Sequence, residues 1–232
     1  LAVPLPQSFQ ETCEAAIRDL PVISAVVQSV DDEQNEYTYI PIDPCQPIIR
    51  AIKTAIEERI PRAFIDLEMR AFEDIPAVFP DAYALRTLSP EEFAAAVLPA
   101  LPRPAADSAN DRRIRRMAFE LHRLELEHSR ILFLPSLLDW PWIREAYLER
   151  AEYPVEEPYF AAIDCYPVDR ATLTFFLGEP PFITHLYQQA RSSFDLEKTL
   201  SVDGVKELLL EARARALAKR PELKRRLGPQ AL

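Results

Sequence analysis

The stretch YTYIPIDPCQPIIRAIKTAIEERIPRAFIDL, residues 37–67, decides the predicted fold. Residues 37–42 alternate and are rich in β-branched and aromatic side chains, and residues 63–67 form a short apolar run, so both predict strands. Between them, Asp43 and Pro44 are typical of a helix start, and one helical face carries Ile48, Ile49, Ile52 and Ile56. A strand, a helix and a strand within about 30 residues predict a βαβ unit with parallel strands and a right-handed crossover.

Further elements extend this unit in both directions. Residues 23–30 and 131–134 are predicted strands, and helices are predicted from Ser8 to Leu20, after Ser89, and from Asp111 to His128; Ser8 with Glu11 and Ser89 with Glu92 are capping boxes. The predicted fold class is α/β, with a mostly parallel mixed sheet flanked by helices and a helical C-terminal segment. Residues 1–152 are predicted to form the α/β core domain. Residues 153–232 are predicted to form a mixed, then helical, segment after a linker at 152–158, packing on the core or on a partner.

Glycine is scarce in this chain, which has 3 Gly and 22 Pro among 232 residues. The glycine-rich turns of dinucleotide-binding and P-loop proteins are therefore absent. The net charge of −10 argues against a general nucleic-acid binder. No apolar run approaches the roughly 20 residues of a membrane span. The 3 cysteines form no C-x-x-C pair, which favours a reducing compartment and predicts a cytoplasmic location.

Acidic residues stand at or near the ends of the predicted strands. Asp43 follows residues 37–42, Asp66 and Glu68 end or follow residues 63–67, and Asp139 lies in the turn after residues 131–134. Because ligands of open α/β sheets bind beyond the carboxyl ends of the strands, these side chains are candidate ligands of Mg²⁺ or Mn²⁺, or a candidate acid and base. The alternative is structural, with Asp43, Asp66 and Asp139 each capping the element that follows.

A dense arginine cluster opens the helix predicted from Asp111. Positive charge is unfavourable at a helix N-terminus, so a carboxylate or a ligand phosphate is expected beside Arg112, Arg113, Arg115 and Arg116. The histidines have no zinc-site spacing and are interpreted as structural; they are His122, His128 and His185.

Four segments carry a resemblance to a known family. They are residues 40–52, residues 62–67, Arg112-x-x-x-Arg116 followed by Met117-Ala118, and residues 130–140. Together, over roughly residues 1–150, they resemble the TraB/ChaN/Tiki/erythromycin-esterase-like superfamily, in particular its poorly characterised bacterial branch. The resemblance implies an α/β fold. Some members of that superfamily are metal-dependent peptidases or hydrolases, and others bind haem or have no known activity.

The chain departs from that family at the site. Pro4-Leu5-Pro6 stands where the family carries a glutamate, and residues 136–139 read Ser-Leu-Leu-Asp where the family carries G-x-x-H. Asp66 and Arg116 still match, and Asp139 stands in place of the family's histidine. The resemblance therefore implies a degenerate, inactive site built from Asp66, Arg116 and Asp139.

Three hypotheses of function follow. The first is a binding or scaffold domain with that degenerate site, acting on a protein partner or within a larger polypeptide, without cofactor, nucleic acid or membrane. The second is a hydrolase or peptidase with Mg²⁺ or Mn²⁺ held by Asp43, Asp66, Glu68 and Asp139. The third is an interaction module whose basic C-terminal helix binds an acidic partner, since residues 206–226 hold eight basic and three acidic residues. Whether the chain is an enzyme is left open.

Overall fold

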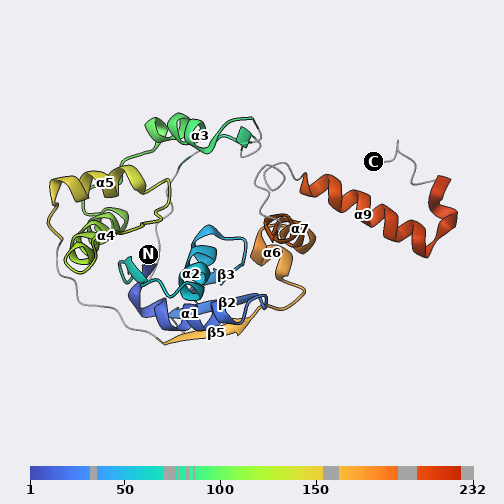
Figure 1. Cartoon of the computed structure of the whole chain (residues 1–232), viewed down its shortest axis with the longest axis horizontal. Coiled ribbons are helices and arrows are strands. Elements are labelled where there is room, and N and C mark those ends of the chain that lie inside the picture. Colours follow the sequence, from blue (N-terminus) through green and yellow to red (C-terminus); the bar gives the residue numbers. More distant parts are fainter. Residues whose placement is uncertain are drawn as a thin grey trace. The chain divides into compact units, whose positions relative to one another are not determined.

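The computed structural model of the chain describes residues 1–31, 36–69, 77, 79–81, 84–85, 87–153, 162–192 and 203–225. It divides into two compact units, Leu1–Val168 and Asp169–Leu232 (Figure 1). The first unit extends beyond the boundary predicted at residues 152 and 153, because a strand at residues 163–167 pairs inside it. The predicted linker at 152–158 lies mostly outside the described residues.

A small parallel sheet lies in the middle of the first unit. β1 (Ala2–Pro6) pairs in parallel with β4 (Ala63–Asp66), with Val3 opposite Phe64. The predicted strand at 131–134 adds one parallel bridge, from Phe133 to Ala2. Two amide bonds accompany this bridge, because the Ala2 nitrogen donates to the Leu132 carbonyl oxygen at 2.8 Å and the Leu134 nitrogen to that of Ala2 at 3.2 Å.

The remaining strands of the described residues form an antiparallel sheet in the order β3-β2-β5, from β3 (Glu36–Ile42), β2 (Ser24–Asp31) and β5 (Ile163–Pro167). The predicted βαβ unit is therefore wrong, because β4 pairs with β1 and lies in a different sheet from β3. The expectation of one mostly parallel mixed sheet is corrected to two separate sheets. The α/β class itself is confirmed, since helices accompany both a parallel and an antiparallel sheet.

Helices flank both sheets. In the first unit the α-helices of the described residues are α1 (Gln10–Arg18), α2 (Pro47–Glu57), α3 (Pro90–Val97), α4 (Ala109–Glu125) and α5 (Trp140–Glu149). Short 3₁₀ turns are Gln7–Phe9 and Leu98–Ala100. The capping box predicted at Ser89 is confirmed, because its side chain accepts from the Glu92 amide while the Glu92 carboxylate accepts from the Ser89 amide.

Two other predicted caps are wrong. α1 begins after Phe9, and the Ser8 hydroxyl and amide both donate to the Glu68 carboxylate instead, at 2.7 and 2.8 Å. α2 begins at Pro47, whereas the Asp43 carboxylate accepts from the Cys45 amide in the turn before it, at 2.8 Å. Proline at the first position of α2 explains this start, since its fixed φ suits a helix and its missing N–H is not needed there.

The parallel sheet separates two apolar clusters, because successive side chains of a strand point to opposite faces. Val3 and Phe64 belong to the cluster under α1, α2 and the antiparallel sheet, with Phe9, Cys13, Ala16, Ile17, Val26, Ile42, Ile49 and Ile52. Ala2 and Ile65 belong to the cluster under α4 and α5, with Ile114, Met117, Ala118, Leu121, Ile143 and Ala146. A two-stranded parallel sheet is thus buried on both faces, as parallel sheets normally are.

The second unit is helical in its described part. It contains α6 (Leu173–Leu177), α7 (Pro181–Ser192), α9 (Gly204–Lys219) and the 3₁₀ turn Pro221–Arg225. α7 and α9 approach closely at Gly204, where an added Cβ would stand 2.7 Å from the Ile183 Cγ2 atom. Among the described residues, no helix is both long and apolar enough to cross a membrane.

Candidate functional site

Two of the predicted acidic residues meet around an arginine at the carboxyl end of β4. Asp66 is the last residue of β4, Arg113 lies near the start of α4, and Asp139 directly precedes α5. The Arg113 guanidinium donates from Nη2 to Asp66 Oδ2 at 2.7 Å and from Nε to both Asp66 oxygens at 3.1 and 3.2 Å. Its Nη2 atom also lies 3.7 Å from Asp139 Oδ2. We call these three residues the Asp66 cluster.

The Asp66 cluster is almost closed to solvent. The exposed fractions of the side chains are 1% for Asp66, 12% for Arg113 and 6% for Asp139. Two further bonds fix its members, because the Leu67 amide donates to Asp66 Oδ1 at 2.7 Å and Arg113 Nη1 donates to Asn110 Oδ1 at 3.2 Å. Charges buried this deeply must be compensated inside the protein, and Asp66 and Arg113 compensate each other.

Asp139 is the less well compensated carboxylate. Burial raises the pKa of Asp139, the Arg113 charge opposes this rise, and the Asp66 charge adds to it. Asp139 Oδ1 is buried and has no hydrogen-bond partner within the described part of the chain, and the carboxylate does not cap α5. Burial disfavours the charge of Arg113, yet Asp66 and Asp139 outweigh burial and raise the pKa of this guanidinium. Arg113 therefore stays charged, and it compensates the charge of Asp66 more fully than that of Asp139.

The other predicted site residues lie elsewhere. Arg116 pairs with Glu120 one turn along α4 at 2.5 Å, and its guanidinium stands 5.2 Å from the centre of the Tyr153 ring. Asp43 accepts from the Cys45 amide, and Glu68 accepts from Ser8, which lies 60 residues earlier in the chain. The structure thus joins Asp66 and Asp139, and it leaves Arg116, Asp43 and Glu68 in separate interactions.

The Asp66 cluster gives no sign of a metal centre. Among the described residues, no group of three or more His, Cys, Asp or Glu side chains lies close enough to hold a metal ion. The four-carboxylate arrangement of Asp43, Asp66, Glu68 and Asp139 has no counterpart there.

Sequence reasoning named Arg113 as one of four clustered arginines expected beside a carboxylate or a phosphate, but did not single it out as the partner of Asp66, although a signal was present. Arg113 lies four residues before Met117, and Asn110 lies three residues before Arg113, so these side chains share a helix face. That face continues the apolar stripe of α4, which packs on Ile65. Of the four clustered arginines, Arg113 is the one whose spacing directs it toward the end of β4.

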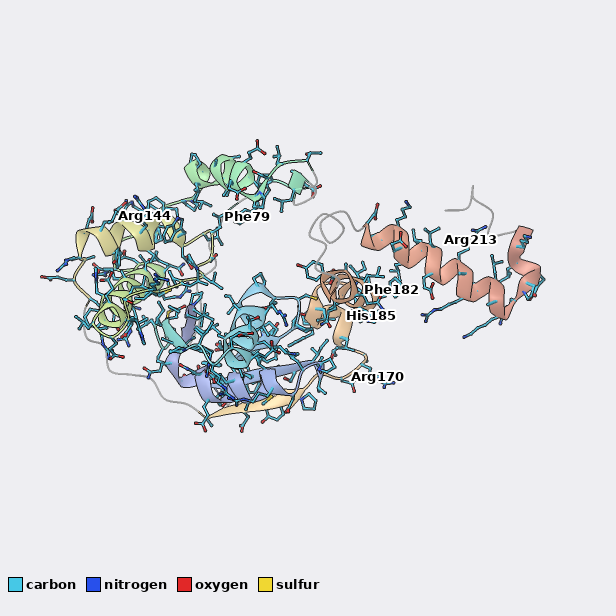
Figure 2. All side chains as sticks on the ribbon, in the orientation of Figure 1. Phe79, Arg144, Arg170, Phe182, His185 and Arg213 are labelled. Atoms are coloured by element: carbon cyan, nitrogen blue, oxygen red, sulfur yellow. The ribbon has the colours of Figure 1, made fainter. Side chains whose placement is uncertain are left out.

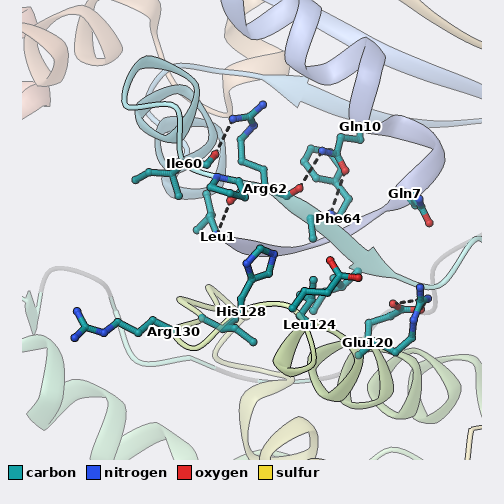
Figure 3. A pocket seen from close by; sticks show the side chains of 16 residues that line it. Leu1, Gln7, Gln10, Ile60, Arg62, Phe64, Glu120, Leu124, His128 and Arg130 are labelled. Atoms are coloured by element: carbon teal, nitrogen blue, oxygen red, sulfur yellow. Dashed lines mark hydrogen bonds and ion pairs between the residues drawn. The ribbon is translucent and has the colours of Figure 1, made fainter.

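One pocket lies at the opposite, amino-terminal end of β4 and has a volume of about 340 Å³. Figure 3 shows Gln10 and Arg62 on one wall and Leu124 and His128 on the other. Arg62 is held by Glu14 through two hydrogen bonds of 2.9 Å, which lower the pKa of Glu14.

A second pocket, which we call the Trp140 pocket, has a volume of about 400 Å³. Five residues of α5 line it at helical spacing: Trp140, Ile143, Arg144, Tyr147 and Leu148. Leu121, Glu125 and His128 line it from α4 and the turn that follows, and Phe133 lines it from the segment beside β1. Neither pocket is lined by Asp66, Arg113 or Asp139.

The carboxylate in the Trp140 pocket is already bonded. Glu125 accepts from the Tyr147 hydroxyl and lies 3.1 Å from His122 Nδ1, and these bonds lower the pKa of Glu125 and keep it ionised. The His122 ring stacks on Tyr147 at 4.2 Å between centroids, and its Nε2 atom lies 2.9 Å from the Tyr147 carbonyl oxygen. His122 therefore has a structural role, as predicted, whereas His185 is exposed on α7 (Figure 2).

Comparisons of this chain with protein-family models, with curated proteins and with solved structures found no match. A functional assignment therefore depends on the geometry of the residues themselves.

Proposed function

We propose that this chain is a binding or scaffold domain without catalytic activity, with the architecture of a degenerate TraB/ChaN/Tiki/erythromycin-esterase-like protein. One observation carries the proposal: Arg113 is hydrogen-bonded to the Asp66 carboxylate and lies 3.7 Å from that of Asp139, inside a buried cluster. Both carboxylates belong to the candidate catalytic residues predicted from the sequence.

A catalytic acid or base must reach its substrate within hydrogen-bond distance. The Asp66 side chain is 1% exposed, and its two oxygens accept from Arg113 and from the Leu67 amide. Such a carboxylate has little capacity left for a substrate or a metal. It can tie β4 to α4, and through Asp139 to α5, which is a structural role.

Hydrolysis assays test this proposal. Wild type, Asp66→Asn and Asp139→Asn are assayed on peptide and ester substrates with Mg²⁺ or Mn²⁺, and each variant is first shown to be folded by circular dichroism. The proposal predicts no metal-dependent turnover in the wild type. Turnover that disappears in the folded Asp66→Asn or Asp139→Asn variants would refute it and restore the metal-dependent hydrolase.

A reducing, cytoplasmic location fits the same proposal. Among the described residues, none of Cys13, Cys45 and Cys165 forms a disulfide of the kind that stabilises secreted proteins. Fractionation of cells with an antibody to the chain tests this location. Recovery in an oxidising compartment would contradict it.

The interaction module at the basic helix remains a second candidate, because α9 buries none of its side chains. Large apolar side chains stay exposed on it, at Val205, Leu209 and Leu210. We expect the full chain to be retained on immobilised polyglutamate in a salt-sensitive way, and a chain that ends at residue 202 to pass through. Equal retention of both chains would count against this candidate.

A further inference from the structure

The Trp140 pocket combines an apolar wall with a cation that has no partner among the residues that the structure describes. Large apolar side chains normally lie inside a protein, yet Trp140 is 38% and Leu148 is 62% exposed. Both side chains line the pocket, and they are eight residues apart on the same face of α5. Exposed apolar side chains gathered at a pocket are typical of a binding site.

Arg144 lies on the same face of α5, four residues from each of them, and Figure 2 labels it on this helix. It is exposed and forms no hydrogen bond or ion pair with another described residue. The carboxylate of the same pocket cannot be counted as its partner, because Glu125 is bonded by Tyr147 and His122. An unpaired guanidinium beside an apolar wall favours an anionic group of a ligand.

We infer that the Trp140 pocket binds a small molecule with an apolar body and one anionic group, such as a carboxylate. The apolar body lies against Trp140, Phe133 and Leu148, and the anion pairs with Arg144. The volume of about 400 Å³ is within the usual range for small-molecule sites. This inference rests on the proposed binding function and names a ligand class for it.

Tryptophan fluorescence gives a direct test, because the chain has two tryptophans and only one lines the pocket. The test uses a Trp142→Phe background, which removes an indole N–H that has no hydrogen-bond partner among the described residues. Trp140 is then the only tryptophan. The full chain is titrated with octanoate, octanamide and octylammonium, which share an apolar body and differ in charge.

Octanoate is expected to change the Trp140 emission in a saturable way and to bind more tightly than octanamide or octylammonium. In this background, Arg144→Gln should weaken octanoate binding about fivefold, which is the range of a partly exposed ion pair, and remove the preference over octanamide. Arg144→Lys should restore part of the preference. Arg50→Gln, at an exposed arginine of α2 outside the pocket, should leave binding unchanged. Leu148→Glu should abolish binding without unfolding the chain, because Leu148 is exposed.

Three results would overturn the inference: no saturable change, equal binding of octanoate and octanamide, or tighter binding of octylammonium. Each would leave the proposed scaffold function standing, because that function is refuted by turnover that depends on Asp66 or Asp139. The two failures are therefore distinguishable.

Discussion

Replacing Arg113 by methionine tests the structural role of the Asp66 cluster. Methionine keeps the length and the apolar stem of the side chain but removes every donor and the positive charge. Asp66 then retains the Leu67 amide as a donor and faces Asp139 without a cation between them. The two buried carboxylates cannot both stay ionised at low cost.

The loss of unfolding free energy can be bounded from both sides. Breaking a buried ion pair by removing one partner costs about 3–5 kcal/mol. The variant can limit this loss by protonating one carboxyl, which costs about 4 kcal/mol at pH 7 for a carboxyl of pKa about 4. We therefore expect Arg113→Met to lose about 3–4 kcal/mol at pH 7. In the folded variant, the carboxyl that takes up the proton has a pKa above its unfolded value. The loss of unfolding free energy should therefore shrink as the pH is lowered toward 5.

Arg116→Met is the matched control on the same helix. Arg116 is 26% exposed, and its partner Glu120 keeps a second arginine, Arg123, at 3.0 Å. We expect a loss of at most about 1 kcal/mol for this variant. Urea unfolding followed by tryptophan fluorescence measures both losses in the first unit, which holds both tryptophans. Equal losses in the two variants would refute the reasoning.

Three further predictions concern other titratable groups. Asp139→Asn should change the unfolding free energy by less than about 1 kcal/mol at pH 7, because Asp139 is poorly compensated there. As pH falls toward 4, the unfolding free energy of the wild type should rise relative to that of this variant, since the pKa of Asp139 is raised in the folded state. A relative rise with increasing pH would contradict this. Glu14→Gln should cost about 1–2 kcal/mol above pH 4.5 and less below it, because Arg62 lowers the pKa of Glu14; a pH-independent difference in urea unfolding would argue otherwise. Burial raises the pKa of Cys13 to about 12, so its thiol should react with Ellman's reagent only on unfolding, whereas the exposed Cys165 reacts at once; rapid reaction of Cys13 in the native chain would show that it is accessible.

Local signals predicted much of the fold. The capping box at Ser89, the strand predicted at residues 63–67 and the helix containing Met117 depend on residues close together in sequence, and each is present, with the strand one residue shorter than predicted. The pairing of the strands was not predictable in this way. β1 was not recognised as a strand, because Pro4 and Pro6 are poor strand residues, yet it lies between β4 and Phe133.

The candidate site was predicted in part. The rule that acidic residues at strand ends converge correctly joined Asp66 and Asp139. It could not tell that the Ser8 hydroxyl would donate to Glu68, because this contact spans 60 residues and depends on the pairing of β1 with β4. It also could not choose Arg113 among four neighbouring arginines without knowing which face of α4 meets β4.

A double-mutant cycle between Asp66 and Arg113 tests the central claim most directly. Unfolding free energies are measured for the wild type, Asp66→Asn, Arg113→Met and the double variant. The cycle isolates the energy of the pair from the other effects of each substitution. If the Asp66 cluster stabilises the packing of α4 on β4, the coupling energy between Asp66 and Arg113 should exceed about 2 kcal/mol, as for hydrogen-bonded charges shielded from water. A coupling energy near zero would contradict the account and reopen Asp66 as a residue available for chemistry.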